Sequence, residues 1–296
     1  MNTVTSITPH LHAASGAARS IGDILVGAGR LSAADAVRIT ERQKQDKTQF
    51  GDAALALQLL TKDDIDFALS KQFDYAYLPA QDTSLSPALV AAYMPFSRVG
   101  ENLRAVRSQL MLRWLNAAPL HKVLALVSPG AAEGRSFIAA NLAVVFAQQG
   151  QRTLLIDADL RANPERNQQA LFKLGKSAGL SGILAGRASI EATKLVPGLP
   201  GLAVIPAGAV PPNPQELLGR AEFGQLLITA SAQFDVILID TPAGGAYADA
   251  ELIAARAGAA LLVARQNQTV LPQAAALARR LQDTGVALLG SVLNDA

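Results

Sequence analysis

Beyond Lys122 the chain alternates between short apolar runs and stretches whose apolar residues recur at helical spacing. The runs are rich in Val, Ile and Leu and show little polar alternation, which is typical of strands buried on both faces of a sheet. Such strands, separated by helices, predict an α/β fold with a doubly wound, mostly parallel sheet. The runs cover residues 122–128, 152–159, 201–207, 235–242, 258–265 and 287–295.

The N-terminal part has a different pattern, an internal repeat within residues 19–78. Ile21-Gly22-Asp23 returns 29 positions later as Phe50-Gly51-Asp52, and Ser32 returns as Thr61. Ser and Thr are good helix N-caps, so each repeat predicts a short helix, a turn and a longer helix. Neither repeat could bury its apolar face alone, and we expect the two to pack together as a small all-α domain.

The remaining segments complete the domain prediction. Residues 1–18 lack apolar periodicity and are interpreted as a leader. Residues 79–97 carry prolines that would break a helix, and we interpret them as a linker. A helix is predicted over 99–115, at the start of an α/β domain that spans 98–296.

Composition narrows the classes of function. Half of the residues are hydrophobic, the formal net charge is +2 and there is no cysteine. A core can therefore be buried, while the charge gives no reason to expect a nucleic acid partner. We see no signal peptide, and prolines interrupt the longest uncharged stretch, so no spanning helix is expected. We expect a cytoplasmic protein whose membrane role, if it has one, depends on a partner.

The first apolar run ends in the sequence SPGAAEGRS, residues 128–136, and leads into a helix. A loop of small residues between a strand and a helix exposes backbone N–H groups and directs the positive helix end at an anion. Gly134 and Ser136 fit the P-loop template G-x-x-x-x-G-K-[ST], whereas Arg135 replaces the lysine and Pro129 the first glycine. A plain structural turn is the alternative. The predicted cofactor-binding residues are Gly130, Ala131, Ala132, Glu133, Gly134, Arg135, Ser136 and Phe137.

Three carboxylates follow two other apolar runs. Asp157 and Asp159 end the run at 152–159, and Asp240 ends the run at 235–242. Ligands bind at the carboxyl edge of parallel sheets, and three carboxylates beside a phosphate loop indicate magnesium and phosphoryl chemistry. We predict that Ser136, Asp157 and Asp240 hold the metal ion. Ser136 would bind it directly and Asp240 through a water molecule. Asp157 is the candidate base, with Asp159 nearby, and a helix cap is the alternative for any single Asp.

Together these motifs resemble those of a known family. SPGAAEGRS, LLIDADLR and VILIDTPA look like the Walker A, Walker A-prime and Walker B motifs of bacterial tyrosine kinases, and the likeness covers about residues 97–295. It is closest to chain-length-determinant kinases of the EpsG type from exopolysaccharide clusters. The resemblance implies ATP and Mg²⁺ as cofactors, catalytic roles for Arg135, Asp157 and Asp159, and an adenine contact from Asn294.

The resemblance also concerns assembly. Glu101, Arg104 and Arg107 are similar to the family's subunit-contact motif, and their spacing places them on one helical stripe. A solvated charged face is the alternative interpretation. A membrane-embedded chain-length regulator or polysaccharide export protein is the implied partner, which would recruit the protein to the inner face of the membrane.

Two departures from the family leave other functions open. Arginine replaces the P-loop lysine, and the usual tyrosine-rich tail is missing. The tyrosines are Tyr75, Tyr77, Tyr93 and Tyr247, so we expect the phosphorylated substrate to lie elsewhere than in a tail. A nucleotide-dependent ATPase switch similar to MinD and ParA, or an inert nucleotide-binding scaffold, are the alternatives to a kinase.

The 29-residue repeat resembles the N-terminal domain of type II secretion and pilus ATPases, some of which bind cyclic di-GMP. Gly22, Gly51, Gln43 and Gln72 fit that pattern. The arginine that the pattern requires before the apolar-Gly pair is replaced by Ser20 in the first repeat and by glutamine in the second. We predict a protein-docking module, with cyclic di-GMP binding as the alternative.

Overall fold

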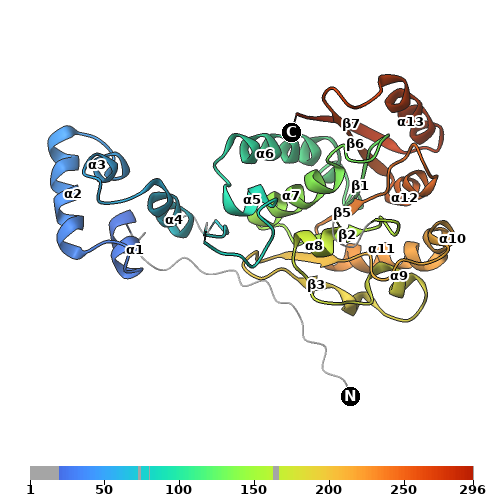
Figure 1. The fold of residues 1–296 in the computed structure, drawn as a ribbon, viewed down its shortest axis with the longest axis horizontal. Coiled ribbons are helices and arrows are strands. Elements are labelled where there is room, and N and C mark those ends of the chain that lie inside the picture. The colour runs from blue at the N-terminus through green and yellow to red at the C-terminus, as the bar shows by residue number, and fades with distance from the viewer. Residues whose placement is uncertain (1–19, 73–74, 80, 163–166, 296) are drawn as a thin grey trace, which may run out of the picture. The chain divides into compact units, whose positions relative to one another are not determined.

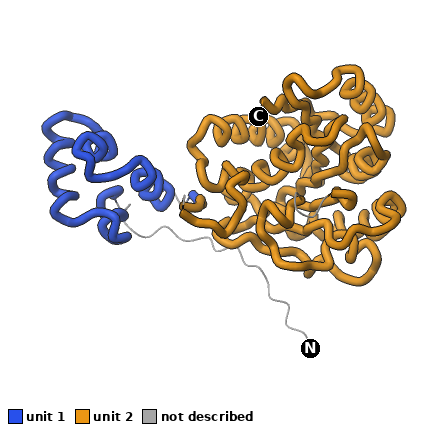
Figure 2. Tube along the Cα trace, viewed as in Figure 1, with its two compact units in different colours: residues 1–75 blue, residues 76–296 orange. Residues whose placement is uncertain are grey.

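The computed structural model describes residues 20–72, 75–79, 81–162 and 167–295. Within them the chain forms two compact units, residues 1–75 and 76–296 (Figures 1 and 2), which are described separately below. The predicted leader, residues 1–18, lies outside the described residues.

Within residues 20–72 the first unit forms four helices, and each repeat forms a short helix, a turn and a longer helix as predicted. Ser32 Oγ accepts the Asp35 N–H at 3.0 Å, and Thr61 Oγ1 accepts the Asp64 N–H at 3.3 Å, so both predicted caps are present. The helices pair between repeats, α1 with α4 and α2 with α3, because each repeat alone leaves its apolar face uncovered. The helices are α1 (Ile21–Gly27), α2 (Ala33–Asp46), α3 (Phe50–Ala56) and α4 (Lys62–Gln72).

The second unit is built on a seven-stranded sheet in the order β3-β4-β2-β5-β1-β6-β7 (Figure 1). All neighbouring strands are parallel except β3 and β4, which confirms the doubly wound, mostly parallel fold. The strands are β1 (Val123–Val127), β2 (Thr153–Asp157), β3 (Lys194–Leu195), β4 (Leu202–Ile205), β5 (Val236–Asp240), β6 (Ala259–Arg265) and β7 (Ala287–Asn294).

Helices cover both faces of the sheet, so the strands contribute alternate side chains to two cores. In β1, Val123, Ala125 and Val127 face one core, and Leu124 and Leu126 face the other. The first core is covered by α9 (Gly179–Leu184), α10 (Pro214–Gly219), α11 (Ala221–Gln233), α12 (Asp249–Ala257) and α13 (Leu271–Asp283). The second is covered by α5 (Val90–Tyr93), α6 (Arg98–Leu110), α7 (Arg135–Gln148) and α8 (Gln168–Leu171). A 3₁₀ turn, η3 (Ile190–Ala192), packs against the first core.

The segment 79–97, which its prolines predict to be a linker, is instead part of the second unit. Leu85 and Leu89 are fully buried in the core under α7. The buried Asn141 of α7 accepts the Ala91 N–H at 2.9 Å and donates to the Ala88 carbonyl at 3.0 Å. The prolines do interrupt the helix, but the apolar residues between them cover α7, so the chain packs where a linker would be solvated.

The helix predicted over 99–115 is α6 followed by a π-helical turn, η1 (Met111–Leu115). Trp114 in this turn stacks on His121 with 3.6 Å between ring centroids and an interplanar angle of 3°. Its Nε1–H donates to the Val123 carbonyl at 3.2 Å. These contacts fix the end of α6 against the first strand of the sheet.

Candidate functional site

The phosphate loop joins β1 to α7 and is held in place by its own backbone and by a buried carboxylate. Gly134 precedes α7 with φ 88°, a left-handed conformation that favours glycine. Glu133 is only 3% exposed and accepts the Gly130 N–H at 2.8 Å. The loop is therefore fixed in front of the N-terminus of a 14-residue helix, whose free N–H groups and dipole favour a bound anion.

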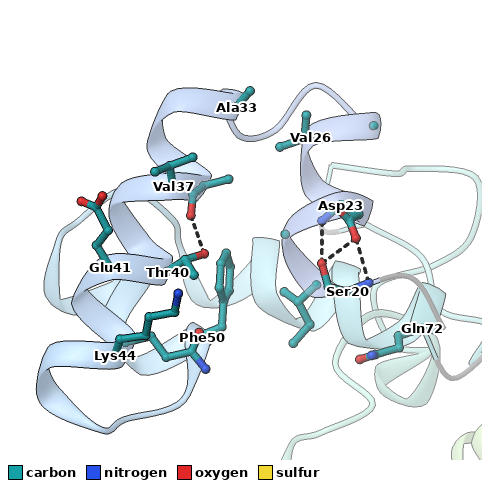
Figure 3. A pocket seen from close by; sticks show the side chains of 15 residues that line it. Ser20, Asp23, Val26, Ala33, Val37, Thr40, Glu41, Lys44, Phe50 and Gln72 are labelled. Atoms are coloured by element: carbon teal, nitrogen blue, oxygen red, sulfur yellow. Dashed lines mark hydrogen bonds between the residues drawn. The ribbon is translucent and has the colours of Figure 1, made fainter. Parts of the chain in front are cut away.

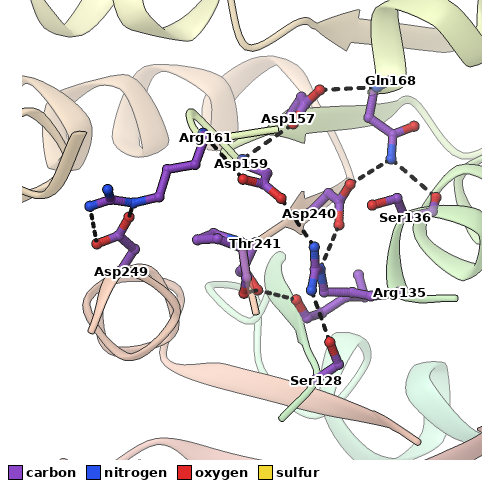
Figure 4. A network of polar contacts seen from close by, with 12 residues as sticks. Ser128, Arg135, Ser136, Asp157, Asp159, Arg161, Gln168, Asp240, Thr241 and Asp249 are labelled. Atoms are coloured by element: carbon purple, nitrogen blue, oxygen red, sulfur yellow. Dashed lines mark hydrogen bonds and ion pairs between the residues drawn. The ribbon is translucent and has the colours of Figure 1, made fainter. Parts of the chain in front are cut away.

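Arg135, at the usual lysine position, reaches across the carboxyl edge of the sheet (Figure 4). Its Nε donates to Asp240 Oδ1 at 3.0 Å, Nη1 to Ser128 Oγ at 2.8 Å and Nη2 to Asp159 Oδ2 at 3.3 Å. Arg135 is 8% exposed, so these are largely desolvated contacts. Each of the three guanidinium nitrogens thus donates to a different partner. A lysine ammonium, with a single nitrogen, could not reproduce this geometry.

The predicted aspartates do lie together, because β2 and β5 are neighbours and their last residues, Asp157 and Asp240, are in register. Burial raises the pKa of Asp157 well above its ordinary value, and the negative charge of Asp240 raises it further. Burial also raises the pKa of Asp159, although the Arg135 charge acts against this. A carboxyl group with a raised pKa is suited to accept a proton near neutral pH.

Gln168, which the sequence analysis missed, connects the groups of this site. Its Nε2 donates to Asp240 Oδ2 at 2.8 Å and to the Ser136 carbonyl at 3.1 Å, and its backbone N–H donates to Asp157 Oδ2 at 3.0 Å (Figure 4). Gln168 is fully buried at the start of α8. No local pattern marks this glutamine as special, since its neighbours are all distant in sequence.

The loop that follows β5 closes another side of the site. Gly244 N–H donates to the Ser128 carbonyl and Gly245 N–H to the Pro129 carbonyl, both at 2.8 Å, so this loop is attached to the phosphate loop. Further along, the buried carboxylate of Asp249 accepts from Arg161 Nε at 2.7 Å (Figure 4). Asp249 was not predicted, although its partner Arg161 lies two residues beyond the apolar run that contains Asp157.

The predicted adenine contact, Asn294, lies beside the phosphate loop. Its Nδ2 donates to the Glu133 carbonyl at 3.2 Å, and a Cβ at Gly134 would come within 2.1 Å of that nitrogen. Gly134 is thus required both by its φ angle and by the close approach of Asn294. The last strand of the sheet thereby brings an amide side chain against the loop residues that directly precede α7.

The predicted subunit-contact stripe lies on α6, and its two arginines make contacts within the chain. Arg104 pairs with Glu101 and donates to the Pro95 carbonyl at 2.7 Å. Arg107 Nη1 donates to the Val145 carbonyl of α7 at 2.9 Å. Glu101 is exposed and both arginines are half-buried, so the stripe combines a structural role with an accessible carboxylate.

The helical unit carries a groove of about 1020 Å³ between α1 and α2 (Figure 3). In the second repeat Ile65 fills the space beside Gly51, at 3.4 Å from a Cβ built there. The equivalent of Ile65 in the first repeat is the smaller Ala36, and the Phe50 ring instead takes the space beside Gly22, at 3.3 Å from a Cβ built there. Apolar side chains of Val26, Val37 and Phe50 line the groove, together with the polar side chains of Lys44 and Gln72.

The oxygen donors at the sheet edge fit a hard cation such as Mg²⁺ only in combination with other ligands. Within the described residues, no group of three or more His, Cys, Asp or Glu side chains is arranged to hold a metal alone. Asp240 and Asp157 supply carboxylate oxygens next to Ser136 at the start of α7, and phosphate oxygens would complete such a shell. Arg135 supplies the positive charge beside Asp240 in this structure.

The sheet order, the phosphate loop and the paired aspartates define a P-loop nucleotide-binding protein. The septum site-determining protein MinD of Pyrococcus horikoshii, complexed with Mg-ADP, matches with a TM-score of 0.51 and 25% identity over 58% of this chain and 70% of that chain. The kinase domain of the Escherichia coli tyrosine kinase ETK matches with a TM-score of 0.67 and 31% identity over 75% of this chain and 89% of that chain. The chain belongs to the bacterial tyrosine-protein kinase family.

Curated sequences agree with this assignment. The putative tyrosine-protein kinase EpsB of Ralstonia solanacearum is 35% identical over 231 residues, which are 74% of this chain and 30% of that protein. The chain therefore spans about 30% of the length of this relative. No family model matches the chain. Among the described residues, no helix is both long enough and apolar enough to cross a bilayer.

Proposed function

We propose that this protein is an ATP-dependent protein-tyrosine kinase that regulates the chain length, polymerisation or export of an exopolysaccharide. The observation that carries the proposal is the arrangement of Asp157 and Asp240, in register on neighbouring strands, opposite the loop that presents Arg135. A kinase needs a phosphate cradle, a cation for the transferring group and a base for the acceptor hydroxyl. The site offers a residue for each of these needs.

The proposed roles follow from the contacts. The N–H groups of residues 131–137 bind the phosphates at the positive end of α7, Gly130 shapes the loop through its bond to Glu133, and Asn294 contacts the adenine. Ser136 and Asp240, with Asp157 near, would hold Mg²⁺, which supplies a positive charge against the phosphate oxygens when it is bound. When ATP is bound, the Arg135 guanidinium leaves the carboxylates of Asp240 and Asp159 and contacts the transferring phosphoryl group.

Proton transfer is the second part of the proposed mechanism. Asp157 and Asp159 both have a raised pKa, because burial disfavours their ionised form. Either can accept the proton of a tyrosine hydroxyl as the new P–O bond forms. Asp157 is our candidate, since backbone N–H groups of Gln168 and Asp159 donate to its two oxygens and hold the carboxyl group in place at the sheet edge.

We also propose a cellular setting for this activity. The protein would work in the cytoplasm, recruited to the inner face of the membrane by a membrane-embedded chain-length regulator or polysaccharide export protein. Self-association would use the stripe of Glu101, Arg104 and Arg107, where Glu101 is exposed and pairs with Arg104 of its own helix.

For the helical unit we propose a protein-docking role through the groove between α1 and α2. The support is its small-residue lining at Gly27, Ala33 and Ala36 with apolar Val37 at the surface, 58% exposed. Titration with cyclic di-GMP by calorimetry tests the alternative ligand. Saturable heat that Gln43→Ala and Lys44→Ala abolish would replace docking by nucleotide binding.

The kinase proposal is tested with γ-labelled ATP, Mg²⁺ and a glutamate–tyrosine copolymer. Transfer of label to tyrosine, lost in Asp240→Ala, supports the kinase. Release of phosphate without protein label would support an ATPase switch of the MinD type. Neither product, with no nucleotide bound at millimolar ATP, would support an inert scaffold.

A further inference from the structure

Gln168 is a fully buried residue, and the proposed mechanism assigns no role to its side chain. Its Nε2 donates to Asp240 Oδ2 at 2.8 Å and to the Ser136 carbonyl at 3.1 Å (Figure 4). Both partners are acceptors, so turning the amide over would set Oε1 against two oxygens. The orientation of the amide is therefore fixed, and it joins the end of β5 to the start of α7.

The other polar atom of this amide, Oε1, is buried as well. Within the part of the chain that the structure describes, it has no hydrogen-bond partner. An unpaired buried oxygen costs free energy, which an apolar side chain at this place would avoid. The backbone cannot shift easily to relieve this cost, because the Asn167 side chain caps α8 by accepting the Ala170 N–H at 3.1 Å. What the side chain contributes is therefore the position of the two groups that Nε2 contacts.

The two carboxylate oxygens of Asp240 are bound by different groups. Oδ1 accepts from Arg135 Nε at 3.0 Å, whereas Oδ2 accepts from Gln168 Nε2. In the proposed mechanism Arg135 leaves Asp240 when ATP is bound. Gln168 is held at its backbone by Asp157 and at its side chain by the Ser136 carbonyl, so it stays. The oxygen that becomes available to a cation is then Oδ1.

From this arrangement we propose that Gln168 is a positioning residue for the cation of phosphoryl transfer, an inference that rests on the proposed function. Nε2 fixes the rotation of the Asp240 carboxylate and leaves Oδ1 directed to the place that Arg135 Nε occupies in this structure. The same nitrogen fixes the backbone of Ser136, so the two residues that would hold Mg²⁺ keep their separation. Removing a hydrogen-bond partner of a metal-holding carboxylate lowers metal affinity by about 10–100-fold.

The test is the affinity of the full-length protein for Mn²⁺ in the presence of ADP, measured by electron paramagnetic resonance. We expect Gln168→Met to weaken Mn²⁺ binding by at least about fivefold, below the usual range because Asp240 would act through water. Gln168→Asn keeps an amide but is a methylene group too short to reach Asp240, so it should weaken binding to a similar extent. Both variants keep the backbone N–H that donates to Asp157. The affinity for ADP in EDTA should stay within about twofold of wild type, because the phosphate-binding N–H groups are unchanged.

Gln148→Met is the matched control. Gln148 is another buried glutamine of the second unit, and its Nε2 donates to the carbonyls of Ala76 and Ala91 at 2.9 and 2.8 Å. Its replacement should lower the midpoint of thermal unfolding and leave the Mn²⁺ affinity unchanged. An equal loss of Mn²⁺ affinity in Gln148→Met and Gln168→Met would trace the effect to a loosened fold and overturn the inference.

The outcomes separate this inference from the proposed function. Wild-type Mn²⁺ affinity in both Gln168 variants overturns the positioning role, whatever the copolymer assay gives. A wild-type protein that binds Mn²⁺ no better than free ADP does also overturns it. Weakened Mn²⁺ binding, together with copolymer labelling that recovers at higher Mg²⁺, supports both proposals. Weakened Mn²⁺ binding in a protein that never labels the copolymer supports the role of Gln168 and removes the kinase.

Discussion

Replacing Arg135 with alanine removes a cation that contacts Asp240 and Asp159 inside the fold. The guanidinium is 8% exposed, and the Asp240 carboxylate is also almost fully buried, so water replaces little of the lost interaction. Breaking a buried ion pair costs about 3–5 kcal/mol. We take the lower end, about 3 kcal/mol, because Asp159 is partly accessible. For a unit of this size the midpoint of thermal unfolding should fall by roughly 6–12 °C.

The pH dependence of this loss has a definite sign. Burial raises the folded pKa of Asp159, and removing Arg135 takes away a charge that lowers it. A carboxyl with a folded pKa above its unfolded value penalises the fold where it is ionised and not where it is protonated. The destabilisation by Arg135→Ala should therefore be larger at pH 8 than at pH 5. Adding Mg²⁺ at pH 8 should reverse part of the fall in the unfolding midpoint of Arg135→Ala, because a cation then again lies beside the carboxylates of Asp240 and Asp159.

Arg135→Lys is the sharper variant, because it keeps the charge. The guanidinium contacts Asp240, Asp159 and Ser128 through three separate nitrogens, so the neighbourhood fits arginine and not a point charge. We expect lysine to cost about 1.5 kcal/mol in stability and to lower kinase activity rather than raise it. Calorimetry and the copolymer assay measure both effects. An unchanged midpoint for Arg135→Ala at pH 8, or higher activity for Arg135→Lys, would refute this reasoning.

Three further predictions concern other parts of the second unit. Asp240→Ala should abolish Mg²⁺-dependent label transfer while the circular dichroism spectrum stays unchanged; residual transfer above about a tenth of wild type would exclude a metal role. The double variant Arg104→Ala, Arg107→Ala should lower both the sedimentation coefficient and the activity, and unchanged sedimentation would favour a purely structural stripe. Asp235→Asn should cost about 0.5 kcal/mol near pH 7, because hydrogen bonds from Arg152 lower the pKa of Asp235. This contribution is present above the unfolded pKa and is lost as the pH falls through the folded pKa, so urea titrations at pH 7 and pH 2 should show the difference shrinking.

The elements that the sequence predicts well are those whose burial is uniform. The strands with continuous apolar runs were predicted to within about two residues, because a strand covered on both faces needs no polar alternation. The edge strand β3 was missed. It has only two residues, Lys194 and Leu195, and Leu195 is 73% exposed, so neither length nor burial leaves a pattern.

Other features depend on tertiary contacts that a local pattern does not contain. Asp157 and Asp240 could be found because each ends a buried strand. Burying a carboxylate there costs free energy unless a cation or a hydrogen-bond donor compensates it. Gln168 enters the site only because α8 packs beside the same strands. The linker prediction for residues 79–97 failed for the same reason. The prolines indicate only that the local backbone is not helical, whereas the burial of Leu85 and Leu89 depends on their contact with α7.

Trp114, which stacks on His121, gives the second unit a tryptophan fluorescence signal that the first unit lacks. The chain has a single tryptophan, and it belongs to the second unit, at the joint between α6 and the sheet. Its emission follows the melting of the nucleotide-binding unit and is silent to the helical repeats. Far-ultraviolet circular dichroism, by contrast, records the helices of both. Comparing the two signals during one denaturation therefore separates the stability of the helical unit from that of the P-loop unit without cutting the chain or adding a label.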